Sequence, residues 1–203
     1  MEKDRMTAFS DGVIAIIITI MVLEMKAPKG HDLSVLKPMI PIFISYVLSF
    51  INIAIYWNNH HHMMHAVNHV NGKILWANVH LLFWLSLIPF VTAWMGENDF
   101  SKWPVALYGI ILLMCGIAYY VLSRSLLSLH GKESTLAAAV GEDAKGKRSI
   151  LFYSTGIALC FVQPWIGFGV YVLVAAAWLI PDKRIEKKLI EEEEKEEEEE
   201  EKA

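Results

Sequence analysis

Residues 5–24 read RMTAFSDGVIAIIITIMVLE, and this stretch decides the fold class. It begins with charged and polar residues, and after Asp11 it continues as an apolar run that contains only Thr19 as a polar side chain before Glu24. A helix needs about 20 apolar residues to cross the hydrocarbon core of a bilayer. The stretch therefore predicts a first transmembrane helix over residues 8–25.

Similar apolar blocks follow along the chain, of which 55% is hydrophobic. We expect further spans at residues 38–57, 74–95 and 104–122, and two more within residues 149–180, on either side of Gln163-Pro164. Each of the last two has only about 16 apolar residues, so it must extend into polar sequence or lie where the bilayer thins. The sequence thus predicts an all-α membrane protein with six transmembrane helices.

The polar sequence outside the spans suggests how the chain is divided. Residues 123–148 form a linker between the fourth and fifth spans, with a short helical stretch expected at residues 136–140. Residues 191–203 hold ten Glu and two Lys, a low-complexity run that is typical of a solvated or disordered end. We therefore expect a six-span domain over residues 1–190 and an acidic tail over residues 191–203.

The distribution of charge excludes some partners and predicts an orientation. Residues 1–190 hold sixteen Lys and Arg against twelve Asp and Glu, without the basic stripe of a nucleic-acid interface. The two cysteines lie in apolar blocks, which excludes a disulfide-framed secreted domain. With the amino terminus inside, fourteen Lys and Arg lie on the cytoplasmic side and four outside. We expect a multi-pass plasma-membrane protein with both termini in the cytoplasm.

The first span carries the most informative side chains. An ionisable residue such as Asp11 within a span suggests a functional site. Ser10 or Asp11 could equally cap the helix, and the residues alone do not decide between these readings. Ile16, Ile20 and Leu23 share one helical face, with Thr19 close to it. Such a stripe more often faces lipid or a protein core than a functional site.

Histidines follow the second span. His60, His61, His62 and His65 come shortly after Trp57, and the spacing of His61 and His65 would let them share a metal ion on one helix face. A metal-dependent enzyme would need further ligands from other spans, and no carboxylate lies inside a later span. A hydrogen-bonding cluster at the membrane interface is therefore favoured over a metal site.

Three short motifs resemble the transmembrane protein 175 family of potassium channels. They are Arg5-x-x-x-Phe9-Ser10-Asp11 at the start of the Ile-rich first span, Trp57-x-x-His60 after the second, and Leu87-Ile88-Pro89-Phe90 in the third. The first motif occurs once, at residues 5–11. A single copy resembles the prokaryotic members of the family, in which four six-span chains surround one pore.

The resemblance implies roles that the residues alone do not assign. It makes the first helix of each chain the pore lining, with Ile16, Ile20 and Leu23 as the constriction and Thr19 contributing to cation preference. It places Arg5, Phe9, Ser10, Asp11, Trp57 and His60 in a network that ties the pore helix to its neighbours. It therefore implies a homotetrameric channel for K⁺ with modest preference over Na⁺, without a cofactor and without enzymatic activity.

Other functions stay compatible with these residues. A proton-conducting or proton-coupled transporter would use Asp11 and the histidines. A metal-dependent membrane enzyme would use His60, His61, His62 and His65. A non-conducting scaffold is the third alternative.

Overall fold

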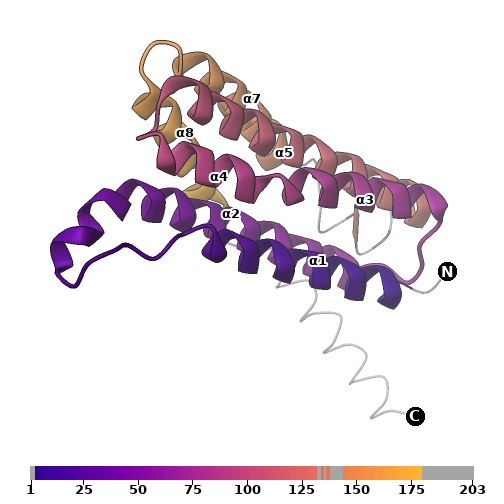
Figure 1. The fold of residues 1–203 in the computed structure, drawn as a ribbon. Coiled ribbons are helices and arrows are strands. Elements are labelled where there is room, and N and C mark those ends of the chain that lie inside the picture. The colour runs from indigo at the N-terminus through magenta and orange to yellow at the C-terminus, as the bar shows by residue number, and fades with distance from the viewer. Residues whose placement is uncertain (1–2, 132–133, 135, 138–143, 180–203) are drawn as a thin grey trace, which may run out of the picture.

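The computed structural model describes residues 3–131, 134, 136–137 and 144–179, and every regular element among them is a helix (Figure 1). This confirms the predicted all-α class. The acidic tail and most of the stretch at residues 136–140 lie outside the described residues. In chain order the helices are α1 (Asp4–Leu23), the 3₁₀ helix η1 (Leu33–Met39), α2 (Ile40–His65), α3 (Gly72–Ser86), α4 (Ile88–Glu97), α5 (Lys102–His130), α7 (Ala144–Leu159) and α8 (Pro164–Leu179).

The helices form six units, if η1 is counted with α2 and α3 with α4. Four units are long and apolar enough to cross a bilayer: α1, η1–α2, α3–α4 and α5. Helices α7 and α8 have 16 residues each and are separated at Gln163, as predicted. Helix α7 begins at Ala144 rather than at residue 149, so it extends into the preceding polar sequence, as its short apolar segment requires.

The third unit is interrupted where the sequence suggested a continuous span. Pro89 has no N–H, and its ring excludes the carbonyl of the residue four positions earlier. The helix therefore tightens just before it: the Leu87 amide donates to the Trp84 carbonyl, three residues back, at 3.2 Å. Helix α4 then starts with Pro89 in its first turn, where a missing N–H costs nothing.

Two helices extend about two turns beyond the predicted spans. Helix α2 ends at His65 instead of residue 57, and α5 ends at His130 instead of residue 122. Hydrophobicity marks the membrane core, but a helix continues until its hydrogen bonding stops. Gly131, with a φ of +86°, ends α5. The histidines after Trp57 thus lie on α2, and the linker begins at residue 131 rather than at residue 123.

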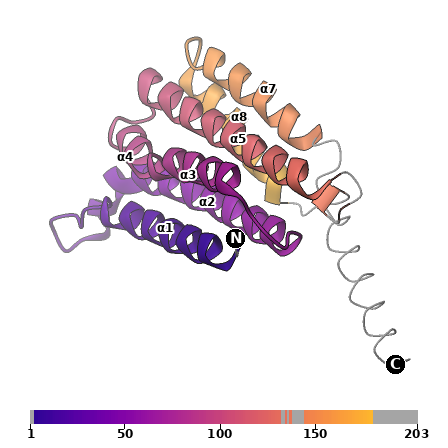
Figure 2. The same ribbon diagram turned by 90° about the vertical axis from the view of Figure 1, so that its right-hand side faces the viewer.

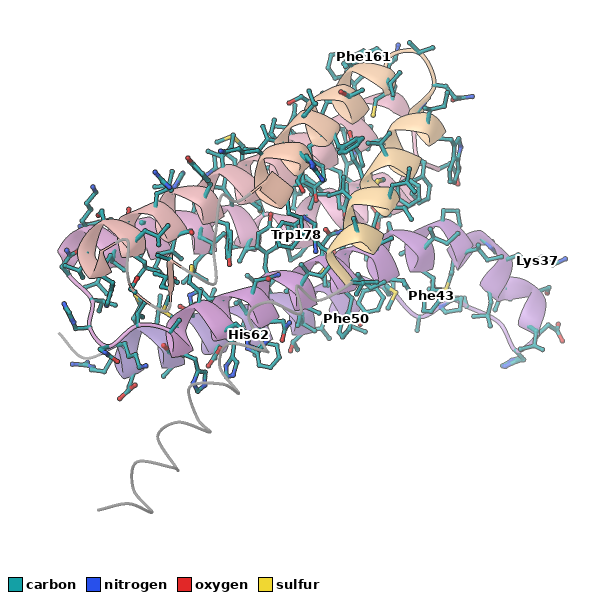
Figure 3. The ribbon with its side chains drawn as sticks, turned by 180° about the vertical axis from the view of Figure 1, so that it is seen from behind. Lys37, Phe43, Phe50, His62, Phe161 and Trp178 are labelled. Atoms are coloured by element: carbon teal, nitrogen blue, oxygen red, sulfur yellow. The ribbon has the colours of Figure 1, made fainter. Side chains whose placement is uncertain are left out.

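Helix α1 lies at one edge of the bundle, where it packs on α2, α3 and α4, whereas α7 lies at the far edge against α5 and α8 (Figure 2). Successive units run in alternating directions, so their ends gather at two ends of the bundle. We call one the basic end; it holds Lys3, Arg5, Lys73, Arg124, Lys145, Lys147 and Arg148. The opposite end holds Lys26, Lys29, Lys37 and Lys102. Figure 3 shows Lys37 and His62 well apart along η1–α2.

Close contacts in the interior hold α2, α4 and α5 together. The Ser49 hydroxyl oxygen lies 2.6 Å from that of Thr92 and 3.0 Å from that of Tyr108, and all three side chains are buried. A Cβ atom at Gly96 would lie 2.7 Å from the Ile42 Cα, so α2 and α4 meet backbone to backbone. Lipid tails are as apolar as the side chains, so there is no hydrophobic driving force between helices inside a bilayer. Close contacts at small residues and hydrogen bonds between side chains hold the helices together instead.

Candidate functional site

Helix α1 has one packed face and one free face. Met6, Ser10, Ile14, Ile17 and Met21 recur at helical spacing and are buried against the bundle. The other face carries the predicted constriction residues: Ile16 is 59% exposed, Ile20 42% and Leu23 72%. Their exposure leaves this face available to a partner outside the chain.

Thr19 is exposed beside this stripe, and its hydroxyl is already oriented. Thr19 Oγ1 donates to the Ala15 carbonyl at 2.8 Å. The hydrogen of the hydroxyl is therefore used within the helix, and the oxygen lone pairs remain to accept. An oxygen held in this way is able to accept a hydrogen bond or to coordinate a cation.

A wide groove runs beside the stripe, between α1 and α4. Its volume is about 570 Å³, and its lining is mostly apolar. Glu24 at the end of α1 and Glu97 at the end of α4 add two carboxylates at the opposite end of the bundle. The rest of the lining comes from Val13, Ile16, Ile17, Ile20, Ser86, Pro89, Phe90, Ala93 and Trp94.

A buried chain of hydrogen bonds joins α1, α2 and α3. His60 Nε2 lies 2.9 Å from Asn78 Oδ1, and Asn78 Nδ2 donates to Ser10 Oγ at 2.9 Å. The Ser10 hydroxyl in turn donates to the Met6 carbonyl at 2.8 Å. Ser10, His60 and Asn78 are each at most 1% exposed. Because an amide oxygen only accepts, His60 Nε2 carries the hydrogen. The rotation of α1 about its axis is thereby tied to two neighbouring helices.

A second link connects the motif aspartate to α2. Trp57 Nε1 donates to Asp11 Oδ1 at 3.0 Å, and the Trp57 ring stacks on His61 with ring centroids 5.8 Å apart. Helix α1 begins at Asp4, so Ser10 and Asp11 lie well inside it. Neither residue caps the helix, and the capping interpretation of the sequence is wrong.

Two residues of the motif lie apart from these links. Arg5 is exposed, and Phe9 is 58% exposed on the free face of α1. The structure thus brings together Ser10, Asp11, Trp57 and His60, but it does not bring Arg5 or Phe9 to them. The contact at the start of α1 comes instead from Lys3, whose Nζ donates to the Met64 carbonyl at 3.1 Å.

Asn78 is the central residue that sequence reasoning missed. It lies near the start of the third span, between Ala77 and Val79, and is 1% exposed. An amide within a span is itself a signal, because it must find a partner there. The sequence could have pointed to Asn78 on this ground, but not to its partners.

The histidines on α2 lie close together without completing a metal site. The rings of His61 and His65 have centroids 4.6 Å apart, and those of His61 and His62 are 5.8 Å apart. His80, a histidine of α3, accepts a hydrogen bond from Trp84 Nε1 at 2.9 Å. Among the described residues, no group of three or more His, Cys, Asp or Glu is arranged to hold a metal ion. The ligand set of a metalloenzyme is therefore not assembled in this part of the chain.

Comparisons with known proteins agree with the motifs. Residues 5–89 match the family described as endosomal/lysosomal potassium channel TMEM175. A potassium channel of Chryseobacterium sp. (strain P1-3) is 54% identical over 191 residues, which cover 94% of this chain and 100% of the relative. A potassium channel of Streptomyces collinus is 33% identical over 60% of this chain and 63% of its own length.

A solved structure is also similar. The lysosomal potassium-selective channel TMEM175 homologue from Chamaesiphon minutus superposes with a TM-score of 0.72 at 28% identity, covering 88% of this chain and 96% of that one. These relatives are channels and not enzymes. With the motif at residues 5–11 and near-complete coverage of a relative at 54% identity, the chain belongs to the TMEM175 family of membrane channels.

Proposed function

We propose that four copies of this chain form a potassium-permeable cation channel in the plasma membrane, with both termini in the cytoplasm. The free face of α1 carries the proposal. Ile16, Ile20 and Leu23 remain exposed on a helix whose other face is packed. The same face holds the polar Thr19 and, at the basic end, Arg5, whereas a face directed only at lipid would be apolar throughout.

Four copies of α1 around one axis would act as a gate because a permeating ion must lose its hydration water at their apolar side chains. A narrow apolar ring at Ile16 dewets, and an ion there loses water without gaining ligands. K⁺ gives up its water at a lower cost than Na⁺, so the ring favours K⁺ to a modest degree. The acceptor oxygens of Thr19, one turn further along the helix, replace part of the lost water.

The hydrogen bonds from α1 to α2 and α3 determine how α1 is presented to that axis. Ser10 is joined through Asn78 to His60, and Asp11 is joined to Trp57. These bonds resist rotation of α1, so they hold Ile16 toward the conduit. The groove between α1 and α4 offers space for side chains of a neighbouring copy, beside Phe90, which is 61% exposed.

A reversal-potential measurement tests the proposed function. In a planar bilayer with K⁺ on one side and Na⁺ on the other, we expect the current to reverse between zero and the K⁺ equilibrium potential. A pH gradient imposed in symmetric K⁺ should leave the reversal potential near zero. Reversal at the proton equilibrium potential would support the proton-conducting alternative, and a protein that carries no current would support the scaffold.

The assembly can be tested separately. One chain has a mass of 23.0 kDa, so four copies have a protein mass of about 92 kDa. We expect this value from light scattering of the solubilised protein after correction for detergent. A protein mass near that of one or two chains would contradict the pore of four α1 helices.

A further inference from the structure

Two histidines meet at the basic end, apart from the links around α1. His69 lies in the turn between α2 and α3, and His130 is the last residue of α5. Their ring centroids are 4.9 Å apart, and the ring planes are inclined by 44°. They are far apart in sequence and are brought together because α3 packs along α5.

The hydrogen bonding of His130 determines which of its ring nitrogens is free. Nδ1 lies 3.1 Å from the Leu126 carbonyl oxygen, which only accepts, so Nδ1 carries the hydrogen. On a neutral ring, Nε2 is then an unprotonated acceptor. This atom is buried and has no hydrogen-bond partner among the described residues. A buried acceptor without a partner points to a missing ion or water.

The spacing of the two rings is compatible with one shared metal ion. Imidazole nitrogens bind Zn²⁺ at about 2.0–2.1 Å, which puts the centres of two rings on one tetrahedral ion about 5 Å apart. Histidines that bind metals usually donate their other ring N–H to a carboxylate or a backbone carbonyl, as His130 does to Leu126. Imidazole is also a preferred ligand of Zn²⁺ and Cu²⁺, whereas Mg²⁺ and Ca²⁺ prefer oxygen.

We infer that His69 and His130 bind one divalent transition-metal ion, with Zn²⁺ as the expected occupant and water completing its coordination. The ion connects the turn after α2 to the end of α5. It thereby restrains the basic end of the bundle, where Lys3 also joins α1 to α2. This site is distinct from the His61–His65 pair, and the proposal does not depend on whether the protein conducts ions.

The test is calorimetric titration of Zn²⁺ into the full-length solubilised protein, purified without a histidine tag. The reference protein carries His61→Ala, His62→Ala and His65→Ala, which removes the other imidazole cluster. We expect it to bind one Zn²⁺ per chain, and we expect His69→Ala or His130→Ala in this reference to weaken binding at least about tenfold. Asn68→Ala, an exposed neutral neighbour in the same turn, should leave binding unchanged.

Electron paramagnetic resonance of bound Cu²⁺ adds a count of ligands. Nitrogen coupling from two imidazoles is expected in the reference protein and from one in either single variant. The inference is overturned if the reference protein binds no Zn²⁺ saturably, or if either histidine can be replaced without weakening binding. Because His69 is exposed in a turn, His69→Ala decides the question even if His130→Ala does not fold.

Discussion

Ile16→Asn is expected to raise the resting conductance of the reconstituted protein at least about tenfold and to reduce its preference for K⁺ over Na⁺. An amide at the constriction lets water remain in the ring, so the ion no longer loses its hydration. Lowering the barrier by only about 1.4 kcal/mol is enough for a tenfold rise in rate. Planar-bilayer recordings would measure both the open probability at rest and the reversal potential.

Val22→Asn is the matched control for this prediction. Val22 lies on the same helix and is 44% exposed, but helical spacing puts it well away from the stripe of Ile16, Ile20 and Leu23. Its replacement should leave conductance and selectivity near those of the unmodified chain. Equal currents from Ile16→Asn and the unmodified protein would exclude Ile16 as the gate, and equal changes at Val22 would exclude the assigned face.

Asn78→Leu is expected to lower the stability of the assembled protein and to disturb gating with it. The substitution keeps the branching at Cγ and the number of side-chain heavy atoms but removes both bonds of the amide, so the His60 Nε2–H is left buried without an acceptor. An unsatisfied buried donor costs about 1–3 kcal/mol. Side-chain bonds between membrane helices average only about 0.6 kcal/mol, because broken partners often find new ones. His60 is 1% exposed, so its stranded N–H has no water to bond to. The cost of an unsatisfied buried donor therefore applies, rather than the smaller average for bonds between membrane helices.

Thermal unfolding of the solubilised protein, followed by size-exclusion chromatography, would measure this effect. A loss of 1 kcal/mol lowers the Tm by about 2–4 °C in a protein of this size. Asn58→Leu is the control, because Asn58 is an exposed amide on α2. Adding His60→Phe to Asn78→Leu should recover part of the lost stability by removing the stranded donor. If Asn78→Leu unfolds at the same temperature as Asn58→Leu, the buried chain does not stabilise the bundle.

The sequence alone predicted most of the helical layout. Apolar length located the long helices, and Pro164 located the separation between α7 and α8. The same local reasoning failed at the ends of α2 and α5, because hydrophobicity reports the lipid boundary and not the end of hydrogen bonding. It also missed the interruption at Leu87, where Pro89 prevents a continuous helix although hydropathy stays high.

For the candidate site too, local sequence reasoning predicted one part and tertiary packing decided the other. Helical periodicity placed Ile16, Ile20 and Leu23 on one face, and the structure leaves that face free. Helical spacing also puts Arg5 and Phe9 on this face, but it could not show that the face stays unpacked while Ser10 and Asp11 bond to neighbouring helices. That outcome depends on the rotation of α1 against α2 and α3, which is settled by packing and by buried bonds.

The sequence by itself therefore determined which segments are helical and apolar, and that Ile16, Ile20 and Leu23 share one face of α1, because both follow from residues within a few turns of one another. Only the tertiary structure decided that Asn78 joins Ser10 to His60 and that His69 meets His130. These partners come from different helices, and the angle and rotation at which helices pack depend on side chains from all of them at once.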